Sequence, residues 1–189
     1  MNKFETVLKK YLDIFADQEM YFTNDRKNVE LFHNIPLNTN AEDVQMKLSA
    51  INDTEISHNA ILGDVKNHIL DLKIDDRLKN NDLSLVENIA HITVKGHPYN
   101  LLHFASVYCN LHKPDVFPIY SEQHITFYKK YIIENKLPLD PEKINTYEVF
   151  SKALNDLVQR LGLTGKMNYL QIRKFGWLYA ETVVKESAS

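Results

Sequence analysis

The stretch that decides the fold is LLHFASVYCNL, residues 101–111. Its apolar side chains fall on most sides of a helix, so no wide polar face remains for solvent. A helix that is hydrophobic nearly all round is normally buried in the centre of a fold. We therefore predict that this segment, which holds Leu101, Phe104 and Tyr108, is the central helix of the protein.

Helical spacing of apolar residues continues on both sides of this segment. Stripes that repeat every three to four residues run from Phe4 to Phe15, from Asp25 to His33 and from Ile56 to Leu72. Three more helices are expected to begin at the capping residues Asn40, Ser121 and Thr146, and the last of them is expected to end at Gly162. The chain is thus expected to be helical along most of its length.

Polar residues mark the connections between these helices. The charged stretch from Lys73 to Asp82 is expected to be a loop. Ser84 with Glu87, and Asn168 with Gln171, have the three-residue separation of a capping box and are expected to begin helices. No alternating run of apolar and polar residues is long enough to predict a sheet.

The fold class that follows is all-α, a single domain of about eight helices spanning residues 1–189. Hydrophobic residues make up 44% of the chain, and ten Tyr, nine Phe and one Trp supply enough large apolar surface for a sizeable core. The length suits one domain or one domain with two lobes.

Charge divides the chain into an acidic and a basic half. Residues 1–94 have a balance of -6 and residues 95–189 a balance of +3, against a net charge of -3 for the whole chain. A polyanion would therefore favour the second half. The alternative is that these charges only keep the helix surfaces solvated.

The composition favours a cytoplasmic protein that does not enter a membrane. No apolar run approaches the roughly 18 residues that a membrane-spanning helix needs. The opening residues, MNKFETVLKK, carry charges where a signal peptide would need an apolar stretch. Cys109 is the single cysteine, which fits a reducing compartment, and its apolar surroundings favour a buried side chain over a nucleophile.

Eight histidines raise the question of a metal site, but their spacing does not support one. His91, His97 and His103 recur every six residues, which does not put them on one helical face. The chain lacks the HExxH, CxxC, GxxxxGK[ST] and GxGxxG patterns, so we predict no metal, no cofactor and no nucleotide-binding loop.

Residues 96–131, GHPYNLLHFASVYCNLHKPDVFPIYSEQHITFYKKY, carry the most functional information. They read as a turn, an apolar helix, a proline-bounded connection and a helix with basic residues. This order resembles the hairpin-to-catalytic-loop segment of the helix-hairpin-helix base-excision DNA glycosylases. The closing residues 172–177, IRKFGW, are similar to the end of small bacterial proteins of this type. The resemblance covers about 80 residues of the second half and implies a glycosylase-like helical architecture.

The resemblance also implies where the site would lie. In the family, a loop like Phe117-Pro118-Ile119-Tyr120 delivers an essential Asp at the start of the next helix, and Ser121 stands at that position here. Ser121 carries no charge, and its ordinary role would be to cap the helix. No catalytic residue is therefore predicted. The residues expected to line a binding site are Tyr120, Ser121, His124, Lys129 and Lys130.

Two functions of different classes remain open. The first is a degenerate DNA glycosylase-like protein that binds nucleic acid or a modified base without catalysis. The second is a protein–protein interaction module of a bacterial stress or defence system. The basic second half and the loop resemblance favour nucleic acid, whereas the acidic first half favours a protein partner.

Overall fold

The computed structural model describes residues 23–51, 56 and 61–173. The predicted helix over Phe4 to Phe15 and the closing residues 174–177 lie outside the described residues. The described elements, in chain order, are α2 (Thr23–Asn34), α3 (Ala41–Ile51), α5 (Leu62–Leu72), α6 (Asp75–Lys79), α7 (Ser84–Ala90), β1 (His91–Val94), β2 (His97–Asn100), α8 (Leu102–His112), η2 (Glu122–His124), α9 (Ile125–Glu134), η3 (Pro141–Lys143) and α10 (Tyr147–Arg160).

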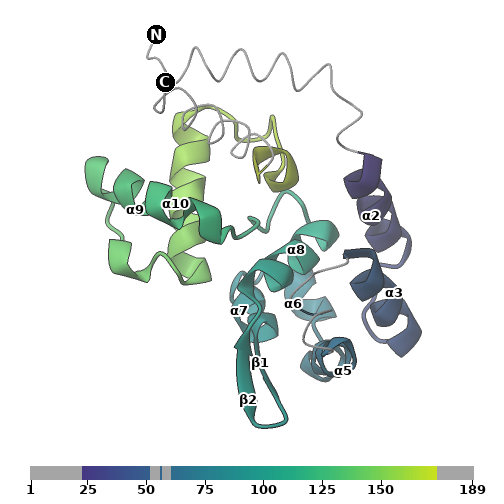
Figure 1. Cartoon of the computed structure of the whole chain (residues 1–189). Coiled ribbons are helices and arrows are strands. Elements are labelled where there is room, and N and C mark those ends of the chain that lie inside the picture. The colour runs from purple at the N-terminus through teal and green to yellow at the C-terminus, as the bar shows by residue number, and fades with distance from the viewer. Residues whose placement is uncertain (1–22, 52–55, 57–60, 174–189) are drawn as a thin grey trace, which may run out of the picture.

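Helix α8 is the central helix, as the sequence predicts (Figure 1). It lies between the group α2, α3, α5 and α6 on one side and the pair α9 and α10 on the other. Leu101, Phe104, Ala105, Tyr108 and Cys109 are fully buried around it. One continuous apolar core extends from Phe32 in α2 to Ile172 near the end of the described chain, so the chain forms a single, mostly helical domain.

The first group of helices follows the predicted stripes. Asn40 caps α3, because its side-chain oxygen accepts a hydrogen bond of 2.8 Å from the backbone N–H of Glu42. Helix α5 begins at Leu62, and it buries Val65 and Ile69 against the core. The predicted helix begins earlier, at Ile56, and its residues 57–60 lie outside the described part of the chain.

The stretch from Lys73 to Asp82 contains the short helix α6, so the predicted loop is wrong there. Two apolar side chains explain the difference, because Ile74 and Leu78 are 0% and 5% exposed and anchor one face of this turn in the core. Of the charged residues between them, Asp76 is exposed, whereas Asp75 and Arg77 are half-buried. A short helix with two apolar residues four apart is easily hidden in a charged stretch.

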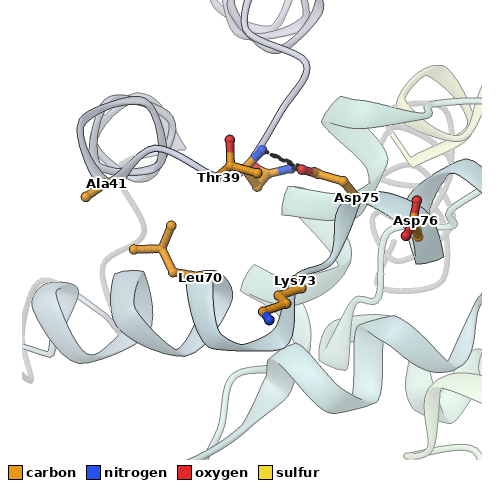
Figure 2. Close-up of a pocket in the computed structure, with 7 residues that line it drawn as sticks. Thr39, Ala41, Leu70, Lys73, Asp75 and Asp76 are labelled. Atoms are coloured by element: carbon orange, nitrogen blue, oxygen red, sulfur yellow. Dashed lines mark hydrogen bonds between the residues drawn. The ribbon is translucent and has the colours of Figure 1, made fainter.

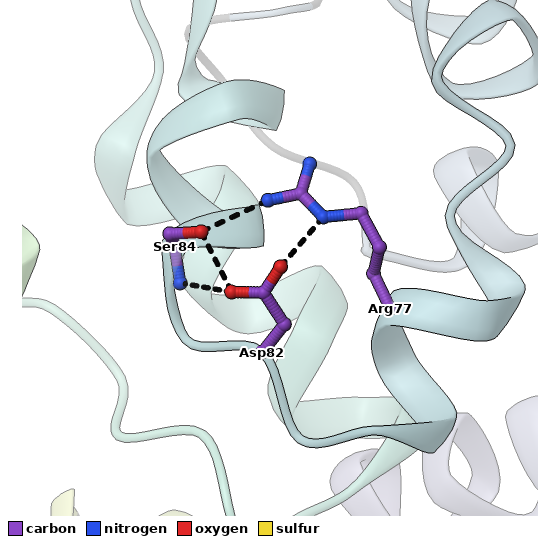
Figure 3. Close-up of polar contacts among 3 residues, drawn as sticks. All are labelled: Arg77, Asp82 and Ser84. Atoms are coloured by element: carbon purple, nitrogen blue, oxygen red, sulfur yellow. Dashed lines mark hydrogen bonds and ion pairs between the residues drawn. The ribbon is translucent and has the colours of Figure 1, made fainter.

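The expected capping box of Ser84 and Glu87 is also wrong. Asp82 caps α7 instead, with its carboxylate accepting hydrogen bonds from the backbone N–H and the hydroxyl of Ser84 at 3.0 and 2.6 Å. Arg77 of α6 fixes that carboxylate at 2.7 Å (Figure 3). These contacts hold the pKa of Asp82 below its usual value and tie α6 to α7. Glu87 accepts a hydrogen bond from the backbone N–H of Tyr147 in α10.

The sequence did not predict the β-hairpin that joins α7 to α8. Strands β1 and β2 pair antiparallel with Val94 opposite His97, and the turn consists of Lys95 and Gly96 with φ of 50° and 82°. Two central residues with positive φ are typical of the tightest hairpin turns. Each strand has four residues, which is too short for an alternation to stand out. The backbone N–H of Leu101 bonds to Ala90 O, so the hairpin brings the start of α8 next to the end of α7.

The second half ends with α9, α10 and a final helical turn. The predicted helix over residues 146–162 is α10, and Gly162 with φ of 64° ends it. The predicted capping box of Asn168 and Gln171 is present, with both reciprocal hydrogen bonds at 2.9 Å.

Candidate functional site

The connection over residues 117–121 is strapped against α8 by hydrogen bonds. Asn110 donates to Phe117 O at 2.7 Å, and the hydroxyl of Tyr147 donates to Pro118 O at 2.8 Å. The backbone N–H of Tyr120 donates to the hydroxyl of Ser106, which itself donates to His103 O. Because all these partners are buried or partly buried, the loop has a fixed position beside the first turns of α8.

Ser121 ends this connection and directly precedes η2, but its side chain does not cap the helix as expected. Its backbone is extended, with φ of -138° and ψ of 113°. The Ser121 carbonyl accepts the hydrogen bond from the backbone N–H of His124 at 3.1 Å. The first turn is closed by backbone alone, so the hydroxyl of Ser121 makes no cap bond there.

Tyr120 is buried rather than displayed on the surface. Its ring is 3% exposed and packs edge-on against Phe150 at 5.1 Å between ring centres. Burial, with Glu122 and Glu87 nearby, raises its pKa to about 12. Tyr120 therefore positions the loop through its ring and its backbone N–H.

Arg173 interacts with two histidines, one on α8 and one on the turn that follows Ser121. Arg173, in the last helical turn, lies 3.2 Å from His103 Nε2 of α8. Burial lowers the pKa of His124, and the positive charge of Arg173 lowers it further, so His124 also lies within the electrostatic reach of Arg173. His103, His124 and Arg173, with Ser121, make up what we call the His–Arg cluster. Three separate segments of the chain contribute to it, namely α8, the turn over residues 121–124 and the last helical turn.

The two predicted lysines lie on α9 and both have carboxylate partners. Lys129 pairs with Glu142 of η3 at 2.6 Å, and Lys130 pairs with Glu134 at 3.6 Å. Both pairs are largely exposed, and exposed ion pairs contribute little to stability. The partners do reduce the local positive charge that either lysine offers to a ligand.

A second polar cluster, which the sequence analysis missed, lies between α2, α3, α6 and α8. Asn38 is 2% exposed, and its backbone and side-chain N–H groups donate to Asp75 at 2.7 to 3.1 Å. Its side-chain oxygen accepts from Lys47 at 2.9 Å, from Tyr108 at 2.6 Å and from His112 at 3.2 Å. We call these five residues the Asn38 cluster.

Burial perturbs the titration of this cluster. Lys47 is 0% exposed, and burial lowers its pKa to about 8, although Asp75 and Asp43 oppose the shift. Burial and the nearby Lys47 lower the pKa of His112 to about 3, so His112 is neutral at physiological pH. The pKa of Tyr108 is raised by burial. The cluster therefore holds Lys47 as its one cation, opposite the carboxylate of Asp75 at physiological pH.

A pocket of about 530 Å³ opens beside the Asn38 cluster. Asn38 and Thr39 line it from the α2–α3 connection, and Ala41 lines it from the start of α3. On the other side the lining residues are Leu70 of α5, Lys73 just after α5, and Asp75 and Asp76 of α6 (Figure 2). This volume is in the range of small-molecule sites. The predicted site residues do not line this pocket.

One signal in the sequence points to the second cluster. Lys47 falls on the apolar stripe of α3 with Val44, Leu48 and Ile51, so its helical position alone would place a lysine in the core. Asn38, Asp75 and Tyr108 of the same cluster come from three other segments, and no local pattern in the sequence connects them with Lys47. Cys109 is buried as predicted, and burial raises its pKa.

The described residues contain no group of three or more His, Cys, Asp or Glu side chains arranged to hold a metal ion. Among them there is also no helix with the length and apolar character that crossing a membrane requires.

The fold and the two clusters define a mostly helical, single-domain protein, and comparison with known proteins gives its family. A family model described as the HI_0787_N N-terminal domain matches residues 7–116, which is more than half of the chain, and the chain belongs to this family. The match includes the whole Asn38 cluster and its pocket but ends before Ser121.

One curated relative is an uncharacterized protein of Haemophilus influenzae. It is 31% identical over 127 residues, which make up 65% of this chain and 59% of the relative. The chain thus spans about three fifths of the length of the relative that it matches. No solved structure matches the chain significantly.

Proposed function

We propose that this chain is a nucleic-acid-binding module of glycosylase-like architecture that lacks base-release chemistry. The observation that carries the proposal is the His–Arg cluster. In this cluster Arg173 lies 3.2 Å from His103, and its charge acts on His124, which follows by three positions the residue that stands where the glycosylase resemblance calls for an Asp.

The chemistry of the cluster suits a phosphodiester. A guanidinium presents several N–H donors to phosphate oxygens and keeps its positive charge at any physiological pH. His124, with its lowered pKa, is a neutral hydrogen-bonding group that can contact a base edge or a phosphate. The positive balance of residues 95–189 favours the approach of a polyanion to this half of the chain.

The same site lacks the charge that sugar–base cleavage requires. A glycosylase carboxylate stabilises positive charge that develops on the sugar. Ser121 offers only a neutral hydroxyl, and Glu122 lies one residue further on. The proposal is therefore binding without cleavage.

The first test measures binding to single-stranded, duplex and abasic DNA as a function of salt. Arg173→Gln should lower the affinity about tenfold, as expected for loss of a charged hydrogen-bonding partner. It should also make the slope of log affinity against log salt shallower by about 0.9, the contribution of one phosphate contact. Combined Lys129→Glu and Lys130→Glu should weaken binding as well, because the charge of the face is reversed.

Lys27→Gln serves as the matched control, since this lysine lies on α2 in the acidic half. It should leave both the affinity and the salt slope unchanged. The proposal fails if the natural protein binds none of the three DNAs at low salt.

The second test assays base release from damaged duplexes. Neither the natural protein nor a variant in which His103, His124 and Arg173 are all replaced by Gln should release a base. Ser121→Asp restores the carboxylate of the family loop, and any activity that it gains would support the resemblance. Base release by the natural protein would contradict the proposal of a non-catalytic module.

A second candidate, the protein–protein interaction module, has one observation in its favour. Helix α9 displays Phe127 and Ile133, which are 39% and 58% exposed. Large apolar side chains on a surface helix are typical of partner contacts when they form a patch. If Phe127→Ser and Ile133→Ser abolish capture of a protein partner while DNA binding is absent, this second function replaces the first.

A further inference from the structure

The pocket beside the Asn38 cluster has features of a ligand site that is separate from the proposed nucleic-acid site. Its lining comes from three segments, the α2–α3 connection, the end of α5 and the start of α6. All of them belong to the acidic half of the chain, where a polyanion would be repelled. The charge of this half therefore disfavours a polyanion as the ligand of the pocket.

One wall of the pocket is a fixed carboxylate. Asp75 accepts hydrogen bonds from the backbone and the side chain of Asn38, so its orientation is set before any ligand arrives (Figure 2). A carboxylate has about four acceptor positions, and these bonds leave some of them open. Asp76, the next residue, adds a second negative charge to the lining. This wall suits an ammonium group.

Lys73 supplies a positive charge to the same pocket. Lys73 follows the last residue of α5, where its backbone lies in the left-handed region with φ of 47°, and it lines the pocket. Within the described residues, neither Lys73 nor Asp76 forms an ion pair, although both are charged and line the same cavity. Charges of opposite sign that do not pair with each other are available to a ligand.

The remaining lining is partly apolar. Leu70 projects from α5 towards the connection that carries Thr39 (Figure 2). Ala41, at the start of α3, also lines the pocket. An apolar side chain of a ligand can pack on these two residues, as most small-molecule sites combine apolar contact with a few polar groups.

We propose that this pocket binds a small zwitterion with an apolar side chain, either a free amino acid or a short peptide. The ammonium group faces Asp75 and Asp76, and the carboxylate faces Lys73. The apolar side chain lies against Leu70. A volume of about 530 Å³ accommodates both sizes of ligand. This inference does not depend on the proposed nucleic-acid function.

The test is a titration followed by the backbone amide NMR signals of the full chain. The probes are leucine and the dipeptide leucylleucine, together with isopentylamine, which lacks the carboxylate, and 4-methylpentanoate, which lacks the ammonium. Leucine or the dipeptide should shift the signals of Thr39, Leu70 and Lys73, and the tighter of the two identifies the size of the ligand. Both single-charge probes should bind at least about tenfold more weakly, as each loses a charge-assisted contact.

Two variants then assign the charges. Lys73→Asn, which tolerates the left-handed backbone, should weaken the zwitterion about tenfold and leave isopentylamine unchanged. Asp76→Asn should weaken the binding of both the zwitterion and isopentylamine. Lys66→Asn, on α5 but outside the lining, is the matched control and should change neither.

Two results would overturn the proposal. One is the absence of any saturable shift with leucine or leucylleucine at about 10 mM, roughly ten times a dissociation constant of about 1 mM. The other is zwitterion binding that both Lys73→Asn and Asp76→Asn leave unchanged. The comparison of the four probes in the natural protein remains decisive if a variant fails to fold.

Discussion

The imidazole of His112 makes folding sensitive to acid. In the folded chain its pKa is lowered to about 3 by burial and by the nearby Lys47, whereas an unfolded histidine titrates near 6.5. Between these values the unfolded state binds a proton that the folded state does not. The free energy of unfolding should therefore fall as pH drops from about 6.5 towards 3, by up to about 1.4 kcal/mol per pH unit from this group.

His112→Gln removes the titrating group and retains a donor for Asn38. Urea unfolding measured between pH 7 and 4 should give a shallower loss of stability for this variant than for the natural protein. His33→Gln, at an exposed position of α2, is the control and should keep the natural slope. Equal slopes for all three proteins would show that His112 is not held neutral in the fold.

At the scale of single residues, the sequence predicted burial better than it predicted polar partners. Cys109 and Tyr108 lie in an apolar run, and both are buried as expected. Asn38 shows no such signal, because it sits between a proline-containing connection and a helix and reads as an ordinary capping residue. Lys47 lies nine residues away, but its other side-chain partners are 37 to 74 residues away, and only the tertiary fold brings them together.

Within helix α8, Phe104 is the side chain whose loss should cost most. It is 0% exposed and its ring centre lies 5.9 Å from that of Tyr108. Phe104→Ala should lower the free energy of unfolding by about 3–5 kcal/mol, the usual cost of a phenylalanine-sized cavity. Val107→Ala, on the half-buried side of the same helix, should cost less than half of that. Chemical denaturation of the two variants checks the ranking, and equal costs would contradict the central position of α8.

The hairpin turn gives a second prediction at this scale. Gly96 has φ of 82°, and a Cβ at this position would meet no atom within 4 Å, so a substitution there is opposed by backbone conformation alone. Gly96→Ala should destabilise the protein by roughly 1 kcal/mol. Gly63→Ala is the matched control, because it lies in α5 with the same open space and should instead stabilise by about 0.5–1 kcal/mol. Thermal unfolding of both variants should shift in opposite directions.

The elements themselves were predictable where apolar residues recur over three turns or more. Helices α3, α8 and α10 each have such a stripe, and their bounds agree closely with the expected ones. Each strand of the hairpin has four residues and α6 has five, so none of them contains enough repeats for a periodicity to emerge. The cap of α7 was assigned to Ser84 rather than Asp82 because both are good capping residues and lie two positions apart.

For the whole molecule, the sequence predicted the fold class but only part of the candidate sites. The central helix and the mostly helical domain follow from composition and periodicity. The charge asymmetry directed attention to residues 95–189, where Ser121 and His124 do lie close together on one short turn. The contact between Arg173 and His103 was not predicted, because the two residues are 70 positions apart in sequence and meet only through packing.

The Asn38 cluster also bears on how the protein folds over time. Asn38 bonds to residues that follow it by 37, 70 and 74 positions, so these bonds form only after long stretches of chain have been brought together. Contacts of this kind tend to be absent from the folding transition state, and their loss then accelerates unfolding with little effect on folding. Stopped-flow measurements should find that the Asn38→Ala variant unfolds faster than the natural protein and refolds at nearly the same rate. The cluster would then govern the lifetime of the folded chain.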